Sequence, residues 1–157
     1  MNPPAGDPGA PAPPPASGIS PFWLAINDPA HPIVLFDGHC NLCNGAVQWI
    51  IKRDRRDRFR FASLQSGFAA AALSDLPNLP DSVVLMHKAT IRTRSAAAIG
   101  IARGLGFPWS LAGAFWIIPA PIRDWLYTWV ARNRYRWFGK QDACMVPTKQ
   151  LRERFLG

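Results

Sequence analysis

Two cysteines separated by two residues are the groups of this chain best suited to chemistry. Cys40 and Cys43 follow a short apolar run, Ile33–Phe36, and an Asp37-Gly38 step. The run is typical of a buried strand, Asp37-Gly38 of its exit turn, and the residues that follow of a helix. A thiol at a helix N-terminus has its pKa lowered from roughly 8.5 to about 3.5–7.5 by free N–H groups and the helix dipole. We therefore predict that Cys40 is the nucleophile and that Cys43, one turn on, closes a disulfide with it.

Three other side chains could take part in this chemistry. Asp37 could accept and return the proton of Cys43, or it could simply accept hydrogen bonds from N–H groups of the turn. His39 would stabilise a thiolate only if it were protonated and close, and we interpret it as an exposed loop histidine. Cys144 could act as a second resolving thiol, and we interpret it as a structural cysteine.

A metal site is the competing interpretation of the cysteines. Cys40, Cys43 and Cys144 with His39 or His87 could form a tetrahedral Cys₃His site. The second closely spaced pair of ligands that such sites usually have is missing. We therefore predict dithiol-disulfide chemistry, with no metal and no other cofactor.

The composition predicts one folded domain with a disordered leader. The chain has 157 residues, of which 48% are hydrophobic, enough to fill a core. Residues 1–20 are rich in proline and small residues and contain no continuous apolar run, so we expect a disordered tail and linker over residues 1–30, before a domain at 31–157. Three cysteines are too few for a disulfide scaffold, and we expect a reducing, cytoplasmic location.

The net charge of +8 is concentrated in Lys52–Arg60 and in Arg123–Gly157. Either segment could meet phosphates or an anionic lipid surface. In the first segment Arg58 and Arg60 alternate with phenylalanines, as on the outer face of a strand. We interpret both segments as solvated surface and expect no nucleic-acid partner.

The order of the predicted elements is strand, helix, strand, helix, strand, strand, helix. The first two strands should be parallel, and the last two should form an antiparallel hairpin. This is the order of a thioredoxin-like α/β domain, βαβ-α-ββα, with the cysteine pair after the first strand. The strands are expected at residues 33–36, 58–62, 82–87 and 90–93, and the helices at about 43–54, 67–76 and 95–104.

Additional helices are expected in the C-terminal third. The stretch Gly104–Ile122 has no charge, but glycines and prolines divide it, so we predict that it does not span a membrane. Pro121 can start a helix with one apolar face. We expect this face and the preceding stretch to cover one side of the sheet, with peripheral membrane contact as the alternative. The apolar face consists of Ile122, Trp125, Leu126, Trp129 and Val130.

The segment Asp37–Cys43 resembles the DGxCxLC motif of the DCC family of thiol-disulfide oxidoreductases. Three later blocks are similar to that family in the same order: Arg94-Ser95-x-Ala97, Pro121-x-Arg123-Asp124, and Asn133 to Gly139 followed by Asp142-x-Cys144. The resemblance covers about residues 33–147. It implies a thioredoxin-like fold and disulfide exchange with a thiol- or disulfide-bearing partner, without naming the partner. Arg134 and Tyr135, in the third block, could form a wall over the dithiol or simply cover the core.

Thioredoxins also place a cis-proline directly before the third strand, beside the dithiol. Here Asp81-Ser82 separates Pro80 from Val83, so Pro80 is only a candidate for that position.

The alternative function is a membrane-surface or protein-binding module in which the cysteine pair is vestigial or regulatory.

Overall fold

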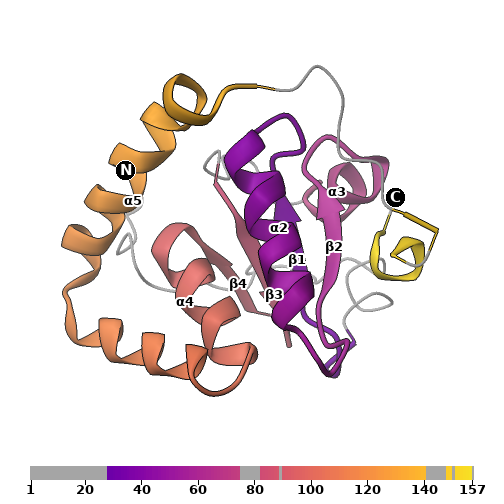
Figure 1. Ribbon diagram of the computed structural model, residues 1–157, viewed down its shortest axis with the longest axis horizontal. Helices are drawn as coiled ribbons and strands as arrows, with labels where there is room; N and C mark the ends of the chain where they lie inside the picture. Colours follow the sequence, from indigo (N-terminus) through magenta and orange to yellow (C-terminus); the bar gives the residue numbers. More distant parts are fainter. Residues whose placement is uncertain (1–27, 75–81, 89, 141–147, 150, 157) are drawn as a thin grey trace, which may run out of the picture.

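A four-stranded mixed sheet forms the centre of the domain (Figure 1). The structure is a computed structural model that describes residues 28–74, 82–88, 90–140, 148–149 and 151–156. The strand order is β2-β1-β3-β4; β1 is parallel to β2 and antiparallel to β3, and β3 and β4 form the predicted hairpin. This mixed α/β arrangement is consistent with a thioredoxin-like fold. The strands are β1 Ile33–Phe36, β2 Arg60–Ser63, β3 Val84–His87 and β4 Thr90–Thr93.

Helices cover both faces of the sheet, so β1 is buried on both sides. Alternate residues of β1 point to opposite faces of the sheet and pack in two hydrophobic cores. Ile33 and Leu35 pack toward α3, and Val34 and Phe36 pack toward α2 and α4. The helices are α2 Asn41–Arg53, α3 Gly67–Ala72 and α4 Arg94–Gly104. The central strand therefore fixes the place at which the cysteine loop leaves the sheet.

Several element boundaries differ from those predicted. Helix α2 begins at Asn41 rather than Cys43, because Cys40 is itself the N-cap residue. Strand β2 begins at Arg60 rather than Arg58. Ser95 does not cap α4, which begins at Arg94; its hydroxyl donates to Asp124 instead. The predicted end of the second helix, at Leu76, lies outside the described residues.

The C-terminal third contains η1 Trp109–Ile117 and α5 Ala120–Phe138. We expected these elements to cover the sheet, and that expectation was wrong. Figure 1 shows them as an outer layer along one side of the molecule, where η1 packs on α4 and α5 packs on α4 and α2. Among the described residues, no helix is long and apolar enough to cross a membrane.

The short helix η2 Arg152–Arg154 fastens the last described segment to β2. The buried Arg154 guanidinium pairs with Asp54 and, at 2.8 Å from Nε to Oδ1, with Asp57. Beyond it, Phe155 forms a parallel bridge with Phe61, and the Leu156 N–H donates to the Phe61 carbonyl at 2.8 Å. The segment is therefore held by charge and by backbone pairing.

Gly104 allows the end of α4 to approach the buried Phe59 ring. A Cβ at this position would lie 2.5 Å from Phe59 Cζ. We expect Gly104→Ala to lower the free energy of unfolding by about 1–3 kcal/mol, because the Phe59 ring is 1% exposed and must shift within a close-packed core. The control is Gly45→Ala, within α2, where a Cβ meets nothing within 4 Å. It should raise stability by about 0.5–1 kcal/mol in urea denaturation, and a loss of stability there would contradict the packing argument.

Candidate active site

The two cysteines lie at the start of α2, as predicted. Both are free thiols. Cys40 is the N-cap residue, and its Sγ accepts the backbone N–H of Cys43 at 3.4 Å. A donor in this position favours negative charge on the Cys40 sulfur. The sequence therefore brings the pair together at a helix terminus.

The two thiols differ in their exposure to solvent, and the pKa of Cys43 is raised. Cys40 has no exposed surface, whereas Cys43 is partly exposed. Burial raises the pKa of the Cys43 thiol to about 12, and the neighbouring Cys40 sulfur contributes to the same shift. Cys43 is therefore a neutral thiol at physiological pH. The thiol that solvent reaches is thus the one whose pKa is raised.

Asp37, at the end of β1, is the centre of a buried hydrogen-bond cluster. Its carboxylate accepts the His39 N–H at 3.0 Å, Gln65 Nε2 at 3.1 Å and the Tyr135 hydroxyl, and it pairs with Arg134 at 3.1 Å. Burial alone would raise its pKa, but these donors and the Arg134 charge outweigh burial and lower the pKa of Asp37 below the ordinary value. Asp37 is therefore a firmly held carboxylate and a weak proton acceptor.

The end of α5 closes over the cysteine loop. Asn41 Nδ2 donates to the Phe138 carbonyl at 2.8 Å, and the Cys40 backbone forms an antiparallel bridge with Lys140. Gly139 has a φ of 77°, which turns the chain after α5 back toward this loop. We call residues 138–140 the cover segment. Asn41 lies inside the DGxCxLC motif, but no local pattern indicates its distant partner.

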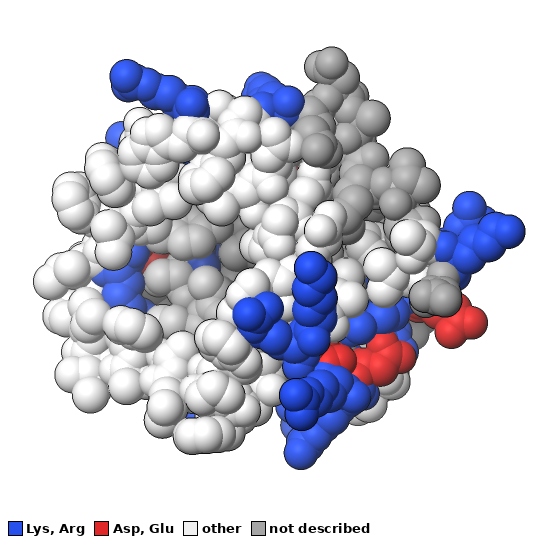
Figure 2. Space-filling view, in the orientation of Figure 1, with Lys and Arg blue, Asp and Glu red and all other residues white. Residues whose placement is uncertain are grey.

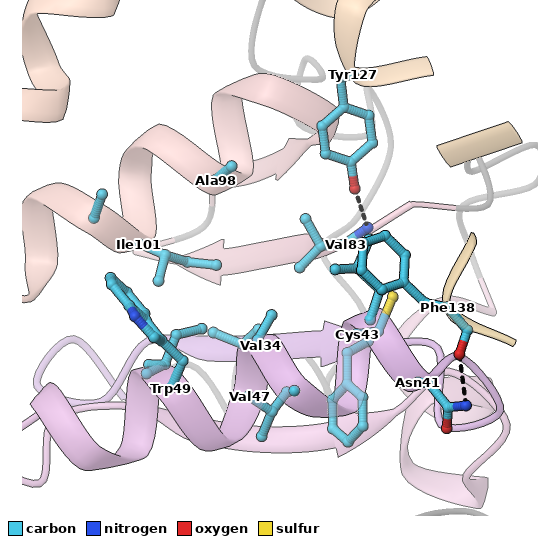
Figure 3. Close-up of a pocket in the computed structure, with 16 residues that line it drawn as sticks. Val34, Asn41, Cys43, Val47, Trp49, Val83, Ala98, Ile101, Tyr127 and Phe138 are labelled. Carbon is cyan, nitrogen blue, oxygen red and sulfur yellow. Dashed lines mark hydrogen bonds between the residues drawn. The ribbon is translucent and has the colours of Figure 1, made fainter. Parts of the chain in front are cut away.

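An apolar cavity of about 650 Å³ lies between α2 and α4. Figure 3 shows Cys43, Asn41 and Phe138 at one end of it and Trp49 and Ile101 toward the other. Tyr127 closes the top, where its hydroxyl accepts the Val83 N–H at 3.1 Å. The described residues that line this cavity carry no charge. A group that approaches Cys43 from the cavity therefore meets an uncharged, apolar surface.

Of the other predicted residues that the structure describes, His39 directly precedes Cys40 and is partly buried rather than exposed, and His87 is not brought to the dithiol. His87 lies at the end of β3, where its Nε2 is 3.1 Å from the Pro29 carbonyl. Within the described part of the chain, no three His, Cys, Asp or Glu side chains form a group able to hold a metal ion. Cys144 and Pro80 both lie outside the described residues.

Comparisons with known proteins point to one family. The model of the DCC1-like thiol-disulfide oxidoreductase family matches residues 34–140. The uncharacterized protein YuxK of Bacillus subtilis is 47% identical over 127 residues, which are 79% of this chain and 93% of that protein. A chloroplastic DCC family protein of Arabidopsis thaliana is 40% identical over 117 residues, 72% of this chain and 68% of the relative. No solved structure matches the chain significantly.

Replacing Asp37 should show how strongly its ion pair holds the site together. Asp37→Asn leaves Arg134 buried without a counter-charge, so we expect the free energy of unfolding to fall by about 3–5 kcal/mol. The carboxylate of Asp57 provides the control: it is 62% exposed, and Arg154 keeps its pair with Asp54 without it, so Asp57→Asn should cost less than about 1 kcal/mol. Urea denaturation at several pH values measures both.

The effect of pH on Asp37→Asn has a definite sign. Because folding lowers the pKa of Asp37, its contribution is complete above the unfolded value near 3.8 and is lost as the pH falls through the folded value. The difference between wild type and Asp37→Asn should therefore be constant near neutrality and shrink in acid. An equal difference at all pH values would contradict this account.

Proposed function

Because the chain belongs to the DCC1-like thiol-disulfide oxidoreductase family, we propose that it exchanges disulfides with a partner through Cys40 and Cys43. The observation that carries the proposal is the pair of free thiols at the start of α2, with the Cys43 N–H directed at Cys40 Sγ. In this position one sulfur is stabilised as a thiolate and the other is within reach to resolve the adduct.

The exchange has two steps. The Cys40 thiolate attacks one sulfur of the partner disulfide, forms a mixed disulfide and releases the first partner thiolate. Cys43 then transfers its proton to a released thiolate or to water and attacks Cys40 Sγ, so the second partner sulfur leaves. The protein ends with a Cys40–Cys43 disulfide, and the partner has gained two electrons. The reverse sequence oxidises a partner dithiol.

The raised pKa of Cys43 supports these roles. Cys43, with its pKa raised to about 12, is a poor attacking group until Cys40 has been consumed. Loss of negative charge from Cys40 in the mixed disulfide removes one cause of that raised pKa. The Arg134 charge acts in the same direction, since it favours the Cys43 thiolate. We assign Asp37 a positioning role, because it holds Arg134 beside the dithiol and is a weak base.

Burial of Cys40 implies that access is controlled. The cover segment pairs with the Cys40 backbone and with Asn41, so attack on a large partner requires these contacts to open. The cavity beside Cys43 gives the partner an apolar surface on which to rest. We propose a partner whose reacting sulfur lies beside an uncharged, apolar group.

Serine variants of the two cysteines test the assigned roles. Cys40→Ser should abolish reduction of a small disulfide substrate, because the attacking sulfur is gone. Cys43→Ser should accumulate mixed disulfides through Cys40, because no second thiol releases the adduct. Non-reducing gels and intact-mass measurement detect the adducts.

Three outcomes would refute this assignment. Equal trapping by both variants would remove the distinction between attacking and resolving thiol, and undiminished activity in either would show that its sulfur is not needed. A Cys40–Cys43 pair that cannot be cycled between dithiol and disulfide would favour a vestigial pair in a binding module.

Loosening the cover segment should make Cys40 more reactive. Asn41→Ala removes the donor to the Phe138 carbonyl, a contact worth about 1 kcal/mol, so the open form should be about fivefold more populated. Alkylation of Cys40, located by tandem mass spectrometry, should accelerate by a similar factor. The matched control is Asn133→Ala, which removes a 2.8 Å bond of the same kind to the Trp129 carbonyl within α5. Equal rates in both variants would show that the Asn41 contact does not limit access.

A further inference from the structure

Helix α5 presents its apolar side chains outward. Ile122, Trp125 and Trp129 are 58%, 68% and 49% exposed, although they belong to the stripe that the sequence predicts to be buried. The buried residues of this helix are Arg123, Asp124 and Arg134. A helix that packs on a protein core usually has the opposite arrangement. Among the described residues, therefore, no element of the domain covers the apolar stripe.

Specific contacts fix this orientation. Ser95 donates to Asp124, Arg134 pairs with Asp37 at 3.1 Å, and the Arg123 guanidinium lies over the Trp116 ring at 4.4 Å. Turning the apolar stripe inward would break these contacts and expose the groups that make them. The outward direction of the stripe is therefore a stable property of the fold.

The apolar surface continues from α5 onto η1. Figure 1 shows the two elements as one outer layer, and in Figure 2 the surface over them is mainly uncharged, with some Lys and Arg side chains at the top and a larger group of charged side chains at the lower right. Monomeric proteins rarely expose continuous apolar surface on this scale unless it binds something. We call this surface the apolar face; it consists of Phe107, Leu111, Phe115, Trp116, Ile117, Ile118, Ile122, Trp125, Leu126, Trp129, Trp137 and Phe138, each at least 37% exposed.

The charges around the apolar face have one sign. From residue 103 to 140 the sequence contains one acidic residue, Asp124, and it is buried. The exposed charged groups of this segment are Arg103, Arg132, Arg136 and Lys140. A second copy of the chain on this face would bring like charges together. Anionic headgroups complement them instead, and tryptophan is suited to the boundary between lipid and water.

We propose that the apolar face docks on an anionic lipid bilayer as an interfacial surface. The tryptophans and aliphatic side chains of η1 and α5 enter the headgroup region, and the arginines meet lipid phosphates. Because α5 ends at the contacts with Asn41 and Cys40, docking holds the dithiol beside the lipid surface. The proposal goes beyond disulfide exchange and does not depend on it.

Vesicle binding tests the proposal with the full chain. Co-sedimentation with vesicles of equal parts phosphatidylcholine and phosphatidylglycerol should recover the protein, with a blue shift of tryptophan emission, and pure phosphatidylcholine should recover less. Trp125→Glu should weaken binding by at least about tenfold, the change expected when one large apolar side chain no longer enters the lipid. Ile122→Glu should act in the same way, so the result does not depend on one variant. Ala71→Glu, which adds the same charge at an exposed position on α3, should leave binding within about twofold.

Several outcomes would overturn the proposal. They are failure of the wild-type protein to bind anionic vesicles, equal weakening by Ala71→Glu, and a dimer that Trp125→Glu dissociates without any effect on vesicles. The last result would assign the face to contacts between copies. Circular dichroism checks that each variant is folded. Reduction of a small water-soluble disulfide should be unchanged in Trp125→Glu, so a failure of lipid binding and a failure of the exchange reaction can be told apart.

Discussion

The buried ion pair between Asp37 and Arg134 is the constraint on which the rest of the site depends. It joins the end of the central strand to a helix almost a hundred residues further along the chain, and both side chains are at most 5% exposed. Neither charge can remain buried without the other, so α5 cannot leave while the cysteine loop stays intact. Tyr135 and Gln65 extend the same cluster. The C-terminal helix is therefore part of the candidate active site and not an appendage to a thioredoxin-like core.

In this arrangement one thiol contacts the helix N–H and the other is the more exposed. Cys40 has the helix N–H that favours a thiolate, but it lies beneath the cover segment. Cys43 reaches the apolar cavity, but burial keeps it protonated. The buried sulfur thus accepts the helix N–H, and the sulfur that reaches the cavity is a neutral thiol. Reactivity in the proposed exchange therefore depends on opening of the cover segment.

The sequence was most informative where local pattern and tertiary structure agree. Neighbouring residues dictate three features that were predicted correctly. They are the strand before Asp37, the position of Cys40 and Cys43 at the start of a helix, and the β3–β4 hairpin. The prediction failed for α5. Its apolar periodicity was recognised, but the apolar side chains point outward instead of toward the domain. Local periodicity cannot show that Asp124 and Arg134 find buried partners on distant elements. The same reason applies to Asn41, whose acceptor at Phe138 belongs to a separate part of the sequence.

The segment held by Arg154 has a consequence for behaviour at high concentration. Strand β2 lies at the edge of the sheet, and an unpaired edge offers N–H and carbonyl groups to a strand of another molecule. Phe155 and Leu156 occupy those groups at Phe61, and Phe155 packs its ring 5.7 Å from that of Phe61. The Asp54 and Asp57 contacts of Arg154 thereby hold a segment that blocks intermolecular β-pairing at this edge of the sheet, a role quite separate from the proposed chemistry at the opposite end of α2.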